Sequence, residues 1–475
     1  ANSLFLIDAA TKTVSFTNCN LEGGFNGFEM VAGSGYDCTI NLTDSDMHHQ
    51  GQCGILAQAT GCVYNIDGCN IYDYGVAKDM GNGGGASMRF LQADADQSSL
   101  TITDSTLTAA DSTMFGDPVL DNDIDNREIN FKSSGTASWV MTNVLIETPD
   151  DRPSEFLTYW QVNENSNATC TWTDVTILGT WEEASFNGGG TITDRNLVVD
   201  FTRVYYEHPV GNTFDSKRMQ FRKVNQTGTY TDCTFILRGG DGDGSIRLSD
   251  GLGSFVATNC YLYNFDGSRC FRDSDAGTDC TFINCTFESE GNAADGYRMR
   301  NGQSTNKYFS GCTFINTDEG VKTSEDLSAP GVLTVDDCVF DGCEQGVEAD
   351  SNVNEVNVTS CKLTNANYNG IEIDGNITTC NITNNTFDEV AEDIIKIQDN
   401  RTFGTLNISY NILAEWGDSF YGIQVDSGVL GTSLTEDYNV FADTVNSASD
   451  INDDSGLLVS GGNSVTTDAP SDVFC

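Results

Sequence analysis

The residues Thr231-Asp232-Cys233-Thr234-Phe235 form a short pattern that recurs along the chain and decides its fold. The pattern is a small polar pair, a small residue, a polar residue and a large apolar residue. A phrase that returns at nearly fixed spacing indicates a solenoid of stacked repeats. Clear copies are Thr17-Asn18-Cys19-Asn20-Leu21, Thr103-Asp104-Ser105-Thr106-Leu107, Thr173-Asp174-Val175-Thr176-Ile177, Thr383-Asn384-Asn385-Thr386-Phe387 and Ser409-Tyr410-Asn411-Ile412-Leu413.

The central residue of each copy marks the repeat length. Sixteen such markers span 420 residues, so the fifteen steps average 28 residues, and the steps after residue 233 range from 23 to 28. This length suits a coil of three short strands and three bends. The apolar residues alternate with period two, as in β-strands, rather than with the 3.6-residue period of a helix. We therefore expect about sixteen coils. The markers are residues 19, 45, 69, 105, 144, 175, 201, 233, 260, 285, 312, 338, 361, 385, 411 and 439.

A second strand with a glycine near its start recurs in the later coils. Examples are Gly346-Val347-Glu348-Ala349-Asp350 and Gly370-Ile371-Glu372-Ile373-Asp374. Apolar and polar residues alternate in these segments, so one side of the strand faces a core and the other faces water.

These patterns predict an all-β fold, a right-handed single-stranded parallel β-helix. The repeat resembles the pectin-lyase-like superfamily of right-handed parallel β-helices, and this resemblance is specific for fold rather than activity. We expect one domain, residues 1–475. Its predicted parts are an N-terminal cap or joining segment (1–13), coils with long loop insertions in the middle of the chain (105–232), regular coils (233–441), and a last coil with a C-terminal cap (442–475).

The composition restricts the functional classes. The 475 residues include 70 acidic and 23 basic side chains, a formal net charge of -47. Nucleic-acid binding is excluded because it needs clustered basic residues, and no stretch is apolar enough for membrane insertion. The chain starts with Ala1, which predicts a mature secreted form, and 17 cysteines favour an extracellular or cell-surface location.

Cysteine occupies eight of the sixteen marker positions and asparagine takes over at 385, 411 and 439. A position that repeats once per coil stacks on itself, so these residues are expected to form an inward ladder. Adjacent rungs are close enough for some disulfides. We expect buried thiols with a few disulfides, the alternative being a fully disulfide-bonded stack.

Basic residues are scarce but concentrated, since ten of the 23 lie between Lys217 and Arg300. Stacked outward positions would form a basic stripe able to bind an acidic polysaccharide, because arginine holds carboxylate and sulfate well. In the lyases that the fold resembles, a basic side chain removes a proton beside a uronate. The alternative is pairing with acids of neighbouring coils. The candidate catalytic residues are Arg247, Arg272, Arg298 and Arg300, and the candidate ligand-binding residues are Arg218 and Arg222.

Aromatic residues cluster where the coil steps lengthen. Four of the five tryptophans lie between residues 139 and 181. Trp160, Trp181 and Tyr205 are candidate ligand-binding residues, because inserted loops often carry function and aromatic rings suit sugars or protein partners. The alternative is that these residues pack on their own coils.

Two further sets of sites are predicted from composition. Asp-rich segments suggest calcium, the one cofactor expected, because calcium prefers oxygen ligands; the candidates are Asp121, Asp123, Asp125, Asp241 and Asp243. Asn-x-Ser/Thr sequons suggest glycosylation, although asparagine is also common in tight bends; the candidates are Asn41, Asn167, Asn225, Asn357 and Asn407.

The chain lacks the Gly-His-Gly motif of β-helical polygalacturonases and the Trp-x-Asp-His pattern of pectate lyases. We therefore expect a non-catalytic secreted protein, either a self-associating subunit of an extracellular filament or surface layer or an adhesive rod. The first alternative is a polysaccharide lyase or hydrolase acting on an acidic glycan. The second is a glycan binder similar to a viral tail spike.

Overall fold

The computed structural model describes the chain in two compact units, residues 1–253 and 254–475. Among the residues that it describes, neither unit contains a helix, so the fold is all-β. In the same parts, no helix is long and apolar enough to cross a membrane. The description omits residues 1–2, 8–11, 34–37, 52, 60, 75–85, 91–98, 110–126, 134, 148–153, 163–165, 180, 189–194, 209–217, 239–243, 266–268, 275–276, 292–293, 301–304, 324–330, 351–352, 418, 443–449 and 468–475.

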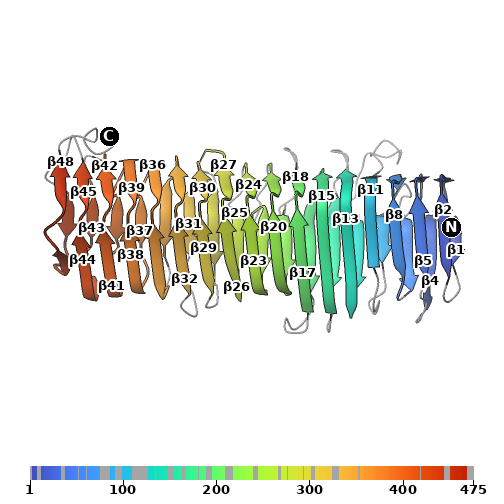
Figure 1. Cartoon of the computed structure of the whole chain (residues 1–475), viewed down its shortest axis with the longest axis horizontal. Coiled ribbons are helices and arrows are strands. Elements are labelled where there is room, and N and C mark those ends of the chain that lie inside the picture. The colour runs from blue at the N-terminus through green and yellow to red at the C-terminus, as the bar shows by residue number, and fades with distance from the viewer. Residues whose placement is uncertain are drawn as a thin grey trace. The chain divides into compact units, whose positions relative to one another are not determined.

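In the first unit, parallel strands stack into two sheets (Figure 1). Nine described strands form sheet 1: β1 (Phe5–Ile7), β4 (Asn26–Gly33), β7 (Cys53–Ala59), β10 (Ala86–Phe90), β12 (Arg127–Ser133), β14 (Ser154–Val162), β16 (Trp181–Gly188), β19 (Arg218–Arg222) and β22 (Ile246–Ser249). Sheet 2 contains β2 (Thr13–Thr17), β3 (Asn20–Glu22), β5 (Thr39–Thr43), β6 (Asp46–His48), β8 (Val63–Asp67), β9 (Asn70–Tyr74), β11 (Ser99–Ala109), β13 (Thr136–Glu147), β15 (Ser166–Leu178), β17 (Arg195–Thr202), β18 (Tyr205–His208), β20 (Asn225–Thr231) and β21 (Thr234–Leu237).

The second unit is built in the same way. Eight described strands form its sheet 1: β25 (Arg269–Ser274), β28 (Asp295–Arg300), β31 (Glu319–Thr323), β34 (Gln345–Ala349), β37 (Ile371–Ile373), β40 (Ile395–Ile397), β43 (Ile423–Val425) and β46 (Ile451–Asp453). Its sheet 2 contains β24 (Tyr261–Asn264), β26 (Gly277–Ile283), β27 (Thr286–Ser289), β29 (Asn306–Ser310), β30 (Thr313–Ile315), β32 (Val332–Asp336), β33 (Val339–Asp341), β35 (Glu355–Thr359), β36 (Lys362–Ala366), β38 (Ile377–Thr383), β39 (Thr386–Val390), β41 (Thr402–Ser409), β42 (Ile412–Ala414), β44 (Leu430–Asp437), β45 (Val440–Ala442), β47 (Leu458–Ser460) and β48 (Val465–Thr467); the unit boundary falls within β23 (Leu252–Thr258).

Each regular coil contributes one strand to sheet 1 and two to sheet 2, as β29, β30 and β31 do, which confirms the predicted three-strand coil. The described sheet-1 strands, nine in the first unit and eight in the second, are one more than the sixteen coils expected. The residue before the marker has positive φ, as Asp337 (φ 53) and Asn384 (φ 60) show. Asparagine and aspartate tolerate this left-handed conformation, which explains why the repeated phrase so often contains them.

The recurring glycine of sheet 1 is required by close packing. A Cβ at Gly320 would lie 2.4 Å from the Phe340 ring and 2.6 Å from the Gly346 carbonyl oxygen. At Gly346 it would lie 2.1 Å from Leu363. Neighbouring coils therefore approach too closely at this position for any side chain.

The marker residues stack as predicted within each unit, with one correction. In the first unit, Val175 and Cys233 both align with Val204, because Thr176 and Thr234 pair with Tyr205. The predicted marker Phe201 is wrong; Phe201 lies three residues earlier, buried and stacked on Trp172 at 4.4 Å. The copy in this coil is Thr202-Arg203-Val204-Tyr205-Tyr206, in which Arg203 (φ 52) takes the left-handed position that asparagine or aspartate usually holds, so the phrase is hard to recognise there.

The expectation of a few disulfides is also wrong for the sixteen described cysteines, which are all thiols. In the second unit, Cys285 contacts Cys260 and Cys312, so the predicted ladder is present. Their sulfurs also approach backbone carbonyl oxygens, as Cys312 Sγ does at 3.4 Å from Phe282 O. Fifteen of the sixteen are buried, which fits small apolar core residues.

Candidate functional site

The outward side of sheet 1 in the second unit carries a continuous column of polar and charged side chains. Arg272 aligns with Arg298, and Arg298 aligns with Lys322. The in-register positions that follow are Glu348, Glu372, Lys396, Gln424 and Asn452. We call this set the charged column. Two of the candidate catalytic residues, Arg272 and Arg298, therefore lie in one row, which Lys322 and Lys396 continue.

Two basic groups of the charged column, Lys322 and Arg298, are paired with acids of the same face. Lys322 Nζ lies 2.6 Å from Glu319 Oε1 and 2.9 Å from Glu348 Oε2. Arg298 Nη1 lies 3.2 Å from Asp295 Oδ2. These side chains are also largely buried, with Lys322 14% and Glu348 12% exposed. Lys322 therefore pairs with an acid of a neighbouring coil, Glu348, as the alternative interpretation expected. Arg298 pairs with Asp295 of its own strand.

Carboxyl groups beside the charged column have pKa values driven in opposite directions. Burial, together with the adjacent Glu319 carboxylate, raises the pKa of Asp295 to about 9. For Glu319, burial acts upward, but hydrogen bonds from Asp295 and Lys322 outweigh it and lower the pKa to about 2. Burial also raises the pKa of Glu348 to about 8. Asp295 therefore holds a proton near neutral pH and donates a hydrogen bond to Glu319.

A second surface of this unit carries two stacked tyrosines at the bend before the marker. The Tyr410 and Tyr438 rings lie 4.8 Å apart with an interplanar angle of 3°, and the residues are 56% and 47% exposed. Both have positive φ, 61° and 57°. Bulky residues seldom adopt this conformation, and holding one there costs about 1–2 kcal/mol.

A hollow of about 430 Å³ adjoins these rings; its lining is Asn407, Ser409, Tyr410, Thr435, Glu436, Asp437, Tyr438, Val459 and Gly461. We call it the tyrosine hollow. In the next coil this bend is one residue longer, because Leu434 pairs with Leu458 whereas Val440 pairs with Val465. Gly462 in the longer bend has φ 76, and a Cβ placed on it would meet no atom within 4 Å. The stack of Tyr410 and Tyr438, which we call the tyrosine ladder, is therefore followed by open space. The lining contains two acidic residues and no basic residue.

Residues 271–467 match the family described as the right handed beta helix region. The fold is a right-handed parallel β-helix. This agrees with the resemblance to the pectin-lyase-like superfamily. No sequence among the curated proteins matches the chain. The match covers the charged column from Arg272 onward and the tyrosine hollow, so both surfaces belong to the β-helix itself rather than to an appended domain.

The remaining predicted arginines do not share one column. In the first unit Arg247 aligns with Gln220, whereas Arg218 aligns with Glu183 and Arg222 with Asn187 and Ser249, which are three parallel columns. Arg300 aligns with Ser274, two positions from the charged column. The side chains of Arg218 and Arg300 lie outside the described residues.

The predicted aromatic site is not assembled by the described residues. Trp139 and Trp172 are fully buried and pack edge to face at 5.1 Å, so these two are core residues rather than loop residues. Tyr205 donates to the Glu207 carboxylate. Trp160 aligns with the buried Phe186 in sheet 1, and Trp181 begins β16, but neither side chain is described.

All five predicted calcium ligands, Asp121, Asp123, Asp125, Asp241 and Asp243, lie outside the described residues. The candidate glycosylation sites lie on sheet 2, where asparagine amides form ladders between coils. Asn65 donates to Asn41 at 2.9 Å, and Asn381 donates to Asn357 at 2.8 Å. Asn167 and Asn225 belong to a similar ladder through Asn196, and Asn407 lines the tyrosine hollow. Glycosylation stays a prediction.

Sequence reasoning missed the tyrosine hollow, although a signal was present. Tyr410 stands in the repeated phrase where most other copies have asparagine, aspartate or glycine. A large aromatic residue at a position that favours Asn, Asp or Gly is a departure from the repeat. Such departures deserve inspection as binding residues because local stability does not explain them.

Proposed function

We propose that this chain is a non-catalytic, extracellular adhesive β-helix that binds a neutral, hydroxyl-rich glycan in the tyrosine hollow. The observation that carries the proposal is the exposed Tyr410–Tyr438 pair, held in a costly backbone conformation beside an open space. Tyrosine offers an apolar ring face and a polar tip, which suits the apolar face and hydroxyl groups of a sugar.

The polar lining of the hollow supports a neutral ligand. Asp437 and Asn407 provide hydrogen-bonding groups at its wall. Glu436 is 1% exposed, and its Oε1 has no hydrogen-bond partner among the described residues. An acidic glycan would face these carboxylates without a basic residue in the lining to neutralise it. Of the basic residues expected to hold a polyanion, Arg298 is instead paired with Asp295 beside the charged column.

The test is a glycan-array screen followed by calorimetric titration of the best ligand. We expect Tyr438→Ala to weaken binding at least tenfold. Tyr368→Ala is the matched control, because Tyr368 is 45% exposed in the same unit but does not line the hollow; it should change affinity less than twofold. Equal affinity of the wild type and Tyr438→Ala would overturn the proposal.

A glycoside hydrolase is the second candidate, favoured by the opposed pKa values of Asp295 and Glu319. A protonated acid near an ionised carboxylate is the combination that general acid catalysis uses. Asp295 and Glu319 are hydrogen-bonded to each other, closer than the roughly 5 Å between the two carboxyls of retaining enzymes, and are 2% and 8% exposed. The assay is release of reducing ends from neutral and uronate polysaccharides. Turnover that disappears in Asp295→Asn and persists in Asp399→Asn, an exposed control, would establish hydrolysis. Absence of turnover with retained binding is the outcome that adhesion predicts.

A further inference from the structure

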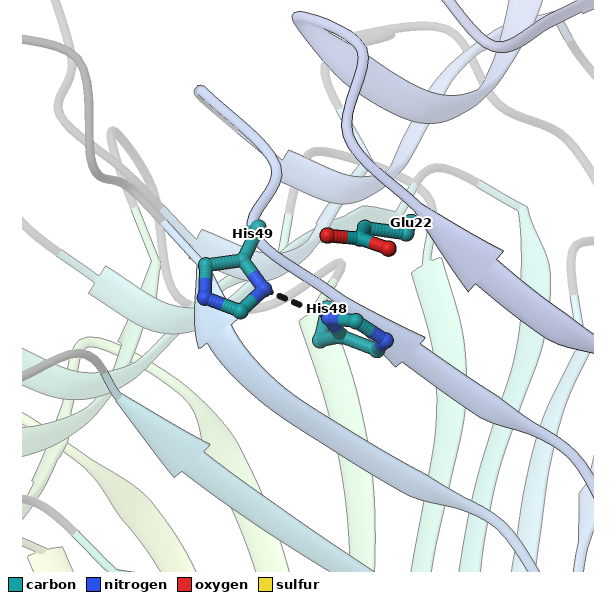
Figure 2. Close-up of side chains that lie close together, drawn as sticks. All are labelled: Glu22, His48 and His49. Atoms are coloured by element: carbon teal, nitrogen blue, oxygen red, sulfur yellow. Dashed lines mark hydrogen bonds between the residues drawn. The ribbon is translucent and has the colours of Figure 1, made fainter.

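Three potential metal ligands meet at a bend of the first unit, remote in sequence from the tyrosine hollow. Glu22 ends β3 and aligns with His48, which ends β6 on the neighbouring coil. His49 follows with φ 59, and this left-handed turn brings its ring back toward His48. Figure 2 shows the two imidazole rings and the Glu22 carboxylate gathered in one place. One ligand atom from each residue lies within 4.8 Å of the others.

The two imidazoles face each other through the same ring atom. His48 Nδ1 lies 2.5 Å from His49 Nδ1, and the ring planes are inclined at 72° (Figure 2). This separation is shorter than an ordinary hydrogen bond between nitrogens. Two unprotonated nitrogens at this distance repel each other, and the repulsion is removed either by a proton on one of them, as in an N–H···N hydrogen bond, or by a metal cation.

The outer nitrogens indicate that both lone pairs point inward. His48 Nε2 lies 2.7 Å from Asn20 Oδ1, and an amide oxygen only accepts, so the proton resides on Nε2. His49 Nε2 faces Asp73 Oδ2 at 3.8 Å, and this carboxylate also favours the proton on Nε2. In both rings Nδ1 is then the unprotonated atom. Histidines that bind metals are commonly oriented in this way by an acceptor on the other nitrogen.

The surroundings hold one ring firmly and leave the other adjustable. His48 is 6% exposed and stacks on Tyr72 at 4.7 Å, with an interplanar angle of 13°. The His49 side chain is 45% exposed. A tetrahedral Zn²⁺ with Zn–N bonds of 2.0–2.1 Å needs its nitrogens about 3.3 Å apart. Rotation of the exposed His49 ring opens the present separation without disturbing the core.

We propose that Glu22, His48 and His49 form a zinc site with an open fourth position for water. Two imidazoles and a carboxylate suit Zn²⁺ and other late divalent metals rather than Ca²⁺, which prefers oxygen ligands. The other group of three carboxyls, Asp295, Asp318 and Glu319 in the second unit, is less suited to a cation. Arg298, Arg269 and Lys322 already supply positive charge there.

Calorimetric titration with Zn²⁺ tests the site, with excess Mg²⁺ present to occupy surface carboxylates. We expect one tight site per chain and a higher melting temperature when Zn²⁺ is bound, since a metal that binds the native state stabilises it. Affinity should fall at least tenfold in Glu22→Gln and in His49→Ala. Co²⁺ should give the intense visible absorption of a tetrahedral complex, and this band should be lost in His49→Ala.

Glu147→Gln is the matched control, because Glu147 is an exposed carboxylate of the same unit outside the group of three. It should bind Zn²⁺ as the wild type does. Circular dichroism of each variant verifies the fold, and Glu22 and His49 are both exposed, so their replacement leaves the core intact. Zn²⁺ affinity that is equal in the wild type, Glu22→Gln and His49→Ala would overturn the proposal, as would a purely octahedral Co²⁺ spectrum.

Discussion

The charged column and the tyrosine hollow lie on the same unit but use their side chains in opposite ways. Lys322 is 14% exposed and contacts two carboxylates, whereas Tyr410 and Tyr438 are about half exposed and stack only on each other. The column is conspicuous in the sequence because basic residues are rare in this chain. The contrast shows that a conspicuous charge pattern can be structural, while a single unusual residue in a repeat can indicate binding.

The geometry of a β-helix explains this difference. Parallel strands lie about 4.8 Å apart, so in-register side chains of opposite charge fall within ion-pair distance of one another. Burial in the face makes these pairs less accessible to salt and water than ordinary surface pairs. In a stack of aromatic rings, in contrast, only the faces between neighbouring rings are in contact. The outer face of the last ring stays exposed, and under the proposed function it contacts the ligand.

The largest change in stability is expected on replacing Lys322, the cation of the charged column that contacts both Glu319 and Glu348. Lys322→Met should lower the free energy of unfolding by about 2–3 kcal/mol, because Glu319 and Glu348 would lose the positive charge that compensates their burial. Chemical denaturation measures this effect. Lys362→Met, at an exposed position of β36, should change stability by less than about 0.5 kcal/mol. Equal effects of the two substitutions would mean that the column contributes nothing to stability.

A smaller effect is expected from Asp295→Asn, and it should depend on pH. The folded-state pKa of Asp295, about 9, lies above its ordinary value of 3.8, so the native state holds an extra proton between these values. Its contribution to stability is therefore complete at low pH and is lost as pH rises toward 9. Asparagine has no proton to lose. Between pH 5.5 and 8.5 the wild type should lose at least about 1.4 kcal/mol relative to Asp295→Asn, the equivalent of one pKa unit.

Denaturation of both proteins at the two pH values measures this difference, and the titrating groups that do not contact Asp295 cancel in the comparison. A wild type that gains stability relative to Asp295→Asn as pH rises would show that Asp295 is ionised in the native state.

The smallest effect on stability is expected at the tyrosine ladder. In Tyr410→Asn, relief of the left-handed backbone, worth about 1–2 kcal/mol, offsets the lost stacking, worth about 0.5–1.5 kcal/mol. The net change should be within about 0.5 kcal/mol, while glycan affinity should fall. Asn384 already occupies the same position one coil earlier. A loss of stability above about 2 kcal/mol would instead make the tyrosines structural.

The fold was largely predictable because one physical constraint repeats in every coil. The Cys and Asn ladder could be read directly, and Asn411 shows why: its amide donates to Ile382 O at 2.9 Å and to Asn439 Oδ1 at 3.0 Å. The predicted markers 19 and 45 already align Glu22 with His48, because each lies three residues after a marker. The repeat does not show how a bend turns a side chain, and the left-handed turn at His49 is what brings the second imidazole to this pair.

Substitution of Gly462 by tyrosine tests glycan binding in the hollow most directly. Gly462 lies in the bend that follows that of Tyr438, and a Cβ placed on it would meet no atom within 4 Å, so Gly462→Tyr should place a ring in the open space beside the hollow while the core stays packed. The measurement is the affinity of Gly462→Tyr for the best array ligand, with circular dichroism confirming the fold. We predict at least a tenfold loss of affinity. Binding as tight as that of the wild type would show that the ligand does not occupy the hollow.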